Sequence, residues 1–395
     1  MTIAVVGGAG AMGRIVVRDL CETAGPQVTI LVADYNRRAA MELARASGGR
    51  ARALQVDAAR VAATARALMR AGTFAVINCC QHELNLPVME AALRAGAHYC
   101  DLGGLFHVTR RQLKEHARWK RAGLLALLGI GAAPGVVNVL ARAAADDMER
   151  VDEIHVMVGN VDRTPGREAG VLGASYSIQT ILDEASLPAA IFTGGRFAFV
   201  EAMSDPQPVQ FPAPVGLRHP ARTLHSEVAT LPLTYRAKGI REVSFRIAFP
   251  DAFAERLRFL HALGMTSTQP IRVGRSKVAP RALLTALHNR LPKAAAGGPP
   301  DEHEVLRVVV RGVRAERPVE EVLDCHTAGI AAWGIGIDVD TGCPPSIAMQ
   351  LLLAGAINAR GVLPPEQAIP VEPFFAALEK RGMRIHRRRN PLIKY

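Results

Sequence analysis

The sequence TIAVVGGAGAMGRIVVRDL, Thr2–Leu20, decides the fold of this 395-residue chain. An apolar run ends at Gly7, glycines follow at G-x-G-x-x-G spacing, and apolar residues then recur at helical intervals. A strand, a glycine turn and a helix in this order are the context in which the spacing indicates a dinucleotide site, with the helix N-terminus facing the phosphates. We assign cofactor binding to the residues of this motif: Gly8, Gly10, Ala11, Met12 and Gly13.

A carboxylate at the end of the next predicted strand supports this interpretation. Asp34 follows the apolar run Val28–Ala33 and lies about 20 positions beyond the last glycine, where an acidic residue accepts hydrogen bonds from the adenosine ribose. The alternative is that Asp34 caps a helix starting near Arg37. Arg37 and Arg38 suit the 2′-phosphate of NADP, whereas a carboxylate at Asp34 repels it. We therefore expect NAD, with NADP as the alternative.

Alternating strand and helix patterns continue to about residue 128 and predict a doubly wound parallel sheet. Ligands bind beyond the carboxyl ends of such strands, and polar residues stand at three of these ends. We place Asp57 near the adenine, with a helix N-cap as an equal alternative. Asn78 and Cys79 are placed near the nicotinamide, although a buried cysteine is more often inert. Asp101, which precedes two glycines, is placed in the cleft between cofactor and substrate.

A hinge divides the chain after this sheet. One helix is expected over 110–122, and the segment GIGAAPGVVNVLARAAAD (129–146) then breaks the pattern at Pro134 and Gly135, which we assign to the cofactor site. From residue 153 the strands alternate between apolar and polar residues, which is typical of a sheet with one exposed face.

This change predicts two domains. Residues 136–334 are expected to form an α+β domain with a mixed sheet that binds substrate and forms a homodimer. An apolar helix over 344–359 is expected to return to the first domain. Residues 1–135 and 335–395 together then form the dinucleotide-binding Rossmann domain with C-terminal helices.

Composition narrows the partners and the compartment. The net charge is +12, and basic residues gather near the C-terminus, which we expect to be exposed and frayed. Because only 5% of residues are aromatic and no nucleic-acid motif accompanies the basic residues, we expect no nucleic-acid partner. No apolar run reaches the length of a membrane-spanning helix. Six cysteines without a C-x-x-C pair indicate free thiols, a cytoplasmic location and no metal site.

Several segments together carry a family resemblance. They are the glycine motif with Asp34, LPVMEAALRAGAHYCDLGG (86–104), APGVVNVLA (133–141), HSEVATLP (225–232) and TGCPPSIAMQLLLAGAI…GVLPPEQAIP (341–370). With them the chain resembles the saccharopine dehydrogenase family, and most closely its lysine 6-dehydrogenase branch. The resemblance implies a Rossmann domain completed by C-terminal helices, a mixed α/β domain, a nicotinamide cofactor and chemistry at a carbon–nitrogen bond.

The chemistry of amine oxidation suggests which residues act. Hydride transfer from an amine carbon requires a neutral amine, and a carboxylate stabilises the iminium that develops. We assign His225 as proton acceptor and Glu227 and Asp101 as the carboxylates. The alternatives are an ordinary hydrogen-bonded histidine at 225 and an exposed strand position at 227. Tyr176, Ser177 and Thr230 are the candidate substrate-binding residues, the first two also being ordinary helix-start residues.

The expected function is an NAD(P)-dependent oxidoreductase that acts on a CH–NH or CH–NH2 bond of a small amino-acid substrate, as the saccharopine and lysine 6-dehydrogenase resemblance implies. After the position of His225, lysine 6-dehydrogenases carry a longer glycine-threonine stretch, where this chain has Ser226, Glu227 and Val228. Two alternatives stay open. One is a non-catalytic nucleotide-binding scaffold, and the other is a carboxynorspermidine-type polyamine dehydrogenase of the same fold.

Overall fold

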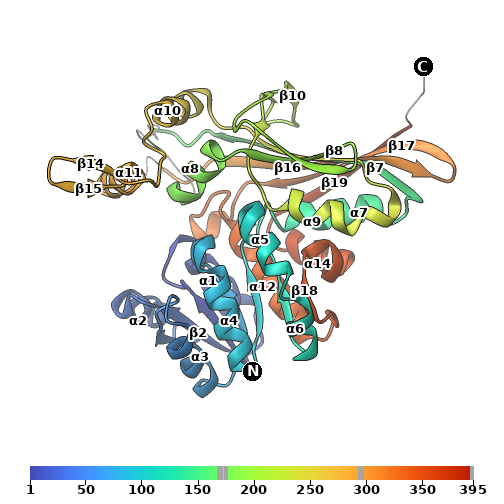
Figure 1. Ribbon diagram of the computed structural model, residues 1–395. Helices are drawn as coiled ribbons and strands as arrows, with labels where there is room; N and C mark the ends of the chain where they lie inside the picture. Colours follow the sequence, from blue (N-terminus) through green and yellow to red (C-terminus); the bar gives the residue numbers. More distant parts are fainter. Residues whose placement is uncertain (167–171, 173–176, 292–297, 392–395) are drawn as a thin grey trace.

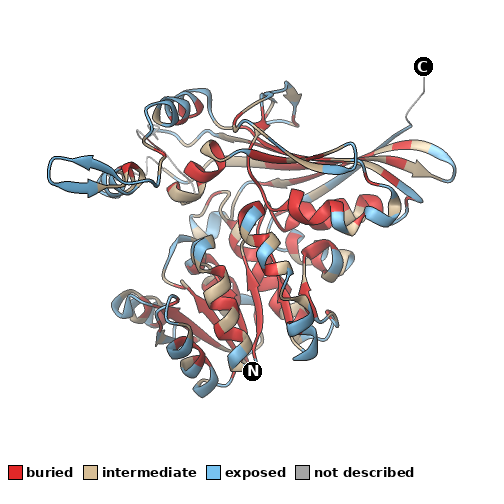
Figure 2. Cartoon of the chain, in the orientation of Figure 1, coloured by how far each residue is buried: buried red, intermediate tan, exposed pale blue. Residues whose placement is uncertain are grey.

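The computed structural model describes residues 1–166, 172, 177–291 and 298–391, and two sheets organise this part of the chain. Figure 1 shows the first sheet and its helices below, with the second sheet lying across the end of the first. Helices α7 (Val136–Ala145) and α9 (Glu227–Thr234) lie between them and are largely buried (Figure 2).

The first sheet is parallel and has the strand order β18-β6-β5-β4-β1-β2-β3. Its strands are nearly continuous apolar runs because helices cover both faces. The order reverses between β1 and β4, which is the switch point where doubly wound sheets bind ligands. This confirms the predicted fold. The bounds are β1 Thr2–Val6, β2 Thr29–Asp34, β3 Ala51–Gln55, β4 Thr73–Asn78, β5 His98–Asp101, β6 Leu125–Leu127 and β18 Gly361–Leu363.

The helices around this sheet differ from the prediction at one point. The single helix expected over 110–122 is two helices, α5 (Leu105–Leu113) and α6 (His116–Arg121). The chain turns between them because α5 buries Gln112 at the strand ends, whereas α6 buries Trp119 beside Tyr99. The other helices of this layer are α1 Ala11–Thr23, α2 Arg37–Ala46, α3 Val61–Arg70, η1 His82–Leu84 and α4 Asn85–Ala95.

Residues from the C-terminal part return to the first sheet. Helix α12 (Val339–Leu353) packs against α1 so closely that a Cβ atom at Gly342 would lie 2.5 Å from Ile15 Cγ2. Strand β18 then extends the sheet beside β6. Helices α13 (Pro365–Ala368) and α14 (Val371–Glu379) follow.

The second sheet is mixed and has the order β19-β17-β16-β7-β13-β8-β9, with the short strand β12 beside β13. Only β7 and β13 pair in parallel among these strands. The bounds are β7 Arg150–Asp162, β8 Ala189–Thr193, β9 Arg196–Val200, β12 Ala221–Arg222, β13 Glu242–Ile247, β16 Glu302–Arg314, β17 Arg317–Thr327 and β19 Arg384–Pro391.

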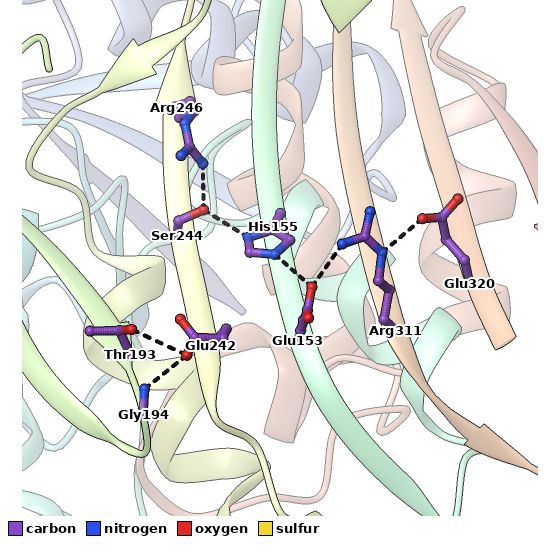
Figure 3. A network of polar contacts seen from close by, with 9 residues as sticks. All are labelled: Glu153, His155, Thr193, Gly194, Glu242, Ser244, Arg246, Arg311 and Glu320. Carbon is purple, nitrogen blue, oxygen red and sulfur yellow. Dashed lines mark hydrogen bonds and ion pairs between the residues drawn. The ribbon is translucent and has the colours of Figure 1, made fainter. Parts of the chain in front are cut away.

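The outer face of the second sheet is polar, whereas its inner face is apolar and covered by α7 and α9. Figure 3 shows a chain of contacts across the outer face. The carboxylate of Glu153 accepts from Arg311 at 2.9 Å and contacts His155 at 3.1 Å. Hydrogen bonds with His155 and Arg311 lower the pKa of Glu153 to about 2, and the bond with His155 has the larger effect. Ser244 links His155 to Arg246. These contacts form a polar and ionic network on this face.

The prediction of a frayed basic tail is wrong up to Pro391. Strand β19 pairs antiparallel with β17 at the sheet edge. Its Arg387 donates to Glu321 at 2.8 Å, and Arg389 also bonds this carboxylate, which is fully buried. The arginines are ordered because they neutralise a buried charge.

A helical arm projects from this domain (Figure 1). It consists of α10 (Asp251–Ala262), the hairpin β14–β15 (Ile271–Val273 and Ser276–Val278) and α11 (Pro280–His288). The arm packs on α8 (Ile178–Ser186) through Phe253 and Leu257. In the described part of the chain, no helix has both the length and the apolarity that crossing a bilayer requires.

Candidate active site

The glycine loop connects β1 to α1 at the switch point. A Cβ atom at Gly13 would lie 2.2 Å from the carbonyl oxygen of Gly7, and one at Gly8 would lie 2.7 Å from the oxygen of Val5. These two glycines are therefore required by packing. Gly10 and Ala11 are exposed at the start of α1, and no side chain caps this helix end. Its free N–H groups are thus available to an anion, as a bound pyrophosphate requires.

Asp34 is tied to this loop. Its Oδ2 accepts from the N–H of Ala9 at 3.0 Å, and its Oδ1 accepts from the N–H of Asn36 at 2.9 Å. The helix cap is Asn36, whose side chain accepts from Ala39 at 3.1 Å, so the alternative of Asp34 as the N-cap is wrong. Each carboxylate oxygen keeps a lone pair, which suits ribose hydroxyls, and that role stays a prediction.

Asp57 is exposed after β3, where its Oδ1 accepts from the N–H of Ala59 at 3.0 Å. The N-cap of α3 is Arg60, so Asp57 forms a turn before the helix and does not cap it. Its proximity to adenine stays a prediction.

Asn78 and Cys79 end β4. The amide of Asn78 is fully buried, donates to Asn85 at 2.9 Å and to Tyr99 at 3.2 Å, and accepts from the N–H of Cys80. Burial raises the pKa of the Cys79 thiol well above its usual value, so the thiol stays protonated. The structure therefore gives Asn78 a packing role beneath the strand ends, and Cys79 lies against Gly7 through its backbone.

Asp101, at the end of β5, is fully buried and accepts four hydrogen bonds. Oδ2 accepts from Gln112 at 2.7 Å and from Tyr99 at 2.9 Å. Oδ1 accepts from the N–H groups of Gly129 at 2.7 Å and Gly103 at 3.0 Å. Burial raises the pKa of this carboxyl, although the hydrogen bonds oppose the shift. All four lone-pair positions are used, so Asp101 fixes the strand-end loops, and its role toward a substrate iminium stays a prediction.

Pro134 fills the space between the ends of β5 and β6. A Cβ atom at Gly103 would lie 2.8 Å from Pro134 Cγ, and one at Gly129 would lie 2.6 Å from the same atom. Gly135 has φ of 132° and a virtual Cβ 2.0 Å from the oxygen of Gly131, so only glycine fits there. Pro134 and Gly135 thus shape the loops that border the cleft, and contact with cofactor stays a prediction.

The segment around residue 226 attaches α9 to these loops. Ser226 Oγ accepts from the N–H of Gly104 at 3.3 Å and lies 3.2 Å from Thr109 Oγ1. The next residue, Glu227, is fully buried in the first turn of α9, so the alternative of an exposed strand position is wrong. His225 and Glu227 therefore lie at the carboxyl end of β5.

His225 lies between two buried carboxylates. Its ring stacks on Phe245 with 3.7 Å between centroids, its Nδ1 is hydrogen-bonded to Glu227, and its Nε2 is 3.7 Å from Glu184 Oε1. Burial lowers the pKa of His225, but the charge and hydrogen bond of Glu227 and the charge of Glu184 outweigh it and raise the pKa above its usual value. The second oxygen of Glu227, Oε1, is buried and finds no hydrogen-bond partner among the described residues.

Glu184 was not among the predicted site residues. It belongs to α8 and reaches His225 only through tertiary packing, so no motif or spacing marks it. Ser177 is the N-cap of that helix and accepts from the N–H of Thr180 at 3.5 Å, which matches its alternative role as a helix-start residue. Tyr176 lies outside the described residues.

Thr230 faces a buried network behind the site. Asn138 Nδ2 lies 3.4 Å from Thr230 Oγ1 and donates to Glu366 Oε2 at 2.8 Å. Burial raises the pKa of Glu366 to about 7. The network joins α7, α9 and α13, and it positions α9 about one turn beyond Glu227.

One further cluster has the composition of a metal site. His82 and Asp183 are 3.5 Å apart, and Glu83 brings a third ligand atom within 4.8 Å of theirs. Arg281 already pairs with Asp183, and its positive charge opposes a cation at this point. The contact joins the end of β4 to α8.

Comparisons with known proteins agree with this geometry. Residues 3–127 match the saccharopine dehydrogenase NADP binding domain, and residues 131–383 match the saccharopine dehydrogenase C-terminal domain. The chain belongs to the saccharopine dehydrogenase family. This confirms the resemblance at family level, and it makes the chain a saccharopine dehydrogenase-family oxidoreductase with an NAD(P) cofactor.

Two curated relatives match most of the chain. Carboxyaminopropylagmatine dehydrogenase of Synechocystis sp. is 25% identical over 391 residues, which is 96% of each chain. Carboxynorspermidine synthase of Vibrio alginolyticus is 24% identical over 335 residues, covering 79% of this chain and 76% of the relative. Apo saccharopine dehydrogenase (L-Glu forming) from Saccharomyces cerevisiae has the same fold, with a TM-score of 0.72, 17% identity and coverage of 98% and 99%.

Proposed function

We propose that this chain is an NAD(P)-dependent dehydrogenase that oxidises, or in reverse forms, the CH–NH bond of a carboxylated amine. The observation that carries the proposal is His225 held between Glu184 and Glu227 at the strand ends that border the cofactor site. Both curated relatives are named for carboxylated amines, which supports this substrate class over free lysine. Lysine and saccharopine, which the lysine 6-dehydrogenase resemblance implies, are the competing substrates.

The proton chemistry follows from the two ring nitrogens. When Nδ1–H donates to Glu227, a neutral ring presents Nε2 as a base. Nε2 takes a proton from the substrate ammonium, because hydride leaves only from the carbon of a neutral amine. Glu184, beside Nε2, then stabilises the imidazolium.

The buried carboxylate of Glu227 is suited to the hydride transfer that follows the proton transfer. A nicotinamide bound at the strand ends supplies the hydride acceptor. As the amine carbon becomes an iminium, the unpartnered Glu227 Oε1 offers a negative charge in surroundings of low dielectric constant. In the reverse direction, protonated His225 donates the proton that the product amine requires.

The test is a substrate panel with both cofactors. Purified protein is mixed with NAD or NADP and with carboxyaminopropylagmatine, carboxynorspermidine, saccharopine or lysine, and reduced nicotinamide is followed by absorbance. We expect turnover with the carboxylated polyamines. Turnover with lysine alone would overturn the proposed substrate class. Turnover with saccharopine alone would keep a carboxylated amine as substrate and overturn the expected preference for carboxylated polyamines. Tight cofactor binding without turnover on any member would favour the non-catalytic scaffold.

A further inference from the structure

A second pair of acidic side chains lies in the same region and takes no part in the steps above. Glu304 stands near the start of β16, and Asp340 stands in the first turn of α12. Their carboxyl groups are in hydrogen-bonding contact with each other. Asn160 Nδ2 lies 3.4 Å from Glu304 Oε2, and Thr341 Oγ1 lies 3.3 Å from Asp340 Oδ1. Two carboxyl groups that approach so closely repel each other unless a proton or a cation lies with them.

No cation of the described chain compensates this pair. Arginine, lysine and histidine side chains of the described residues form no ion pair with Glu304 or Asp340, and the charges that act on them come from Glu302 and Asp338. Burial raises the pKa of both carboxyl groups. One proton shared between the two carboxyl groups accounts for their hydrogen bond and leaves the pair with one negative charge, with which no described cation forms an ion pair.

The pair also lacks hydrogen-bond donors. Asp340 is 3% exposed, and apart from the Glu304 carboxyl group its Oδ2 has no hydrogen-bond partner among the described residues. Thr327, the cross-strand neighbour of Glu304, is likewise 3% exposed, and its Oγ1 is buried without a partner in the same part of the chain. Buried polar atoms are normally hydrogen-bonded, so two orphaned oxygen atoms beside a carboxyl pair indicate a missing donor. Glu304 is only partly buried.

The loops of the candidate active site connect this pair to His225. Thr341 Cγ2 would lie 3.4 Å from a Cβ atom on Gly131. The N–H of Gly131 donates to the oxygen of Pro134, and Pro134 packs against Gly103. The next residue, Gly104, donates to Ser226. The carboxyl pair and His225 therefore border the same strand-end loops, on two different elements.

We propose that Glu304 and Asp340 bind the distal cationic group of the substrate, an ammonium or a guanidinium, while His225 acts at the reacting amine. This inference rests on the proposed function and narrows it to carboxylated amines that carry a second cation. An ammonium or guanidinium group supplies several N–H donors together with the missing charge, and such charge-assisted hydrogen bonds are the strong ones. A site built in this way discriminates against an analogue whose far end is neutral, because the carboxylates would then be buried without a partner.

The binding experiment uses simple cations that the dehydrogenase reaction does not consume. Calorimetric titration of the cofactor-loaded protein with agmatine and with putrescine compares a guanidinium end with an ammonium end, and an alkyl urea of equal length is the neutral probe. We expect binding of at least one cation and none of the urea. Glu304→Gln and Asp340→Asn should each weaken it about tenfold or more, as truncation of a buried charged pair does. Equal binding by both variants and wild type would overturn the proposal.

The control is Glu320→Gln, which removes a carboxylate of the same domain that pairs with Arg311 on the outer face. It should bind the cations as wild type does. Thermal melts establish that each variant folds. Because each substitution relieves the repulsion between two carboxyl groups, we expect no fall in Tm. If only one of the two variants folds, that variant is sufficient for the binding test.

Turnover separates this inference from the proposed function. With substrates that differ only at the far end, Glu304→Gln should raise KM for the cationic form and leave kcat and the neutral form nearly unchanged. Equal effects on both forms would overturn the cation site and leave the dehydrogenase intact. Binding that depends on Glu304 without turnover on any carboxylated amine would leave the cation site standing and overturn the proposed function.

Discussion

Two histidines on opposite faces of the second sheet illustrate how the same residue types serve different ends. On the outer face, His155 contacts Glu153 and Ser244, and Arg311 and Arg246 supply positive charge (Figure 3). On the inner side, His225 contacts Glu227 and lies near Glu184, and both of these carboxylates are buried.

The difference lies in how charge is balanced. The outer network is partly exposed, and its carboxylates Glu153 and Glu320 pair with Arg311, in the manner of ordinary surface ion pairs. The inner cluster is buried, and two carboxylates lie beside one imidazole ring. Shifted titration in a desolvated cluster beside a cofactor site is a mark of function, whereas a neutralised network is a mark of structure.

The largest expected effect contrasts the two histidines directly. His225→Asn should lower kcat/KM for the carboxylated amine by about 10²- to 10⁴-fold, since it removes the general base. His155→Asn is the matched control and should change kcat/KM less than about twofold. Steady-state kinetics with saturating cofactor measures both. Similar losses in the two variants would show that the inner histidine has no special role.

The next effect concerns pH. Glu227 raises the pKa of His225, so oxidation of the amine, which uses the neutral ring, should increase with pH along a limb above the usual histidine range. Glu227→Gln removes the carboxylate that favours the imidazolium. The limb should then move to lower pH, because burial alone lowers the pKa of the ring. Profiles of kcat/KM against pH report this shift, and Glu153→Gln should leave the limb in place. An unmoved limb in Glu227→Gln would contradict the assignment.

A smaller effect is expected from the serines beside the histidines. Ser226→Ala removes the acceptor for Gly104, so kcat should fall by roughly fivefold, the equivalent of one hydrogen bond, without a shift of the pH limb. Ser244→Ala breaks the link between His155 and Arg246 and should leave kcat unchanged. A displaced limb in Ser226→Ala would mean that this serine tunes the histidine instead of positioning it.

The smallest effect is on stability. The pKa of Glu153 is about 2 in the folded chain against an ordinary value of 4.5, so its contribution is present above pH 4.5 and is lost as pH falls toward 2. Because the pair is partly exposed and screened by solvent, Glu153→Gln should reduce the free energy of unfolding at neutral pH by about 1 kcal/mol or less. Urea titrations at several pH values follow the difference, which should shrink as the solution is acidified. A constant difference would assign the effect to packing.

Local patterns explain what could be predicted from the sequence. The glycine motif and Asp34 are recognisable because both depend on residues that are close together in the sequence. Gly13 packs on Gly7, and Asp34 stands where a strand ends. Parallel strands are likewise visible as continuous apolar runs. His225 was found through a family motif, but its environment was not.

Tertiary contacts explain the rest. Glu184 approaches His225 from another helix, and Gln112 and Tyr99 occupy the carboxylate of Asp101 from two different elements. Helix α9 contains Pro232, a residue that the pattern of a helix interior normally excludes. Such contacts have no trace in the spacing of residues along the chain.

The strand β18 has a consequence for the order in which the protein is made. It is the edge strand of the parallel sheet and lies beside β6. More than two hundred residues separate β6 from β18 in the sequence, and they include the described strands of the second sheet other than β19. During synthesis from the N-terminus, the cofactor domain therefore waits with the edge of β6 uncovered until Gly361–Leu363 leaves the ribosome. The chain then crosses once more, and β19 closes the other sheet last. Neither sheet is complete before residues 361–391 have been translated, so a nascent chain that stops before them leaves the edges of β6 and β17 unpaired.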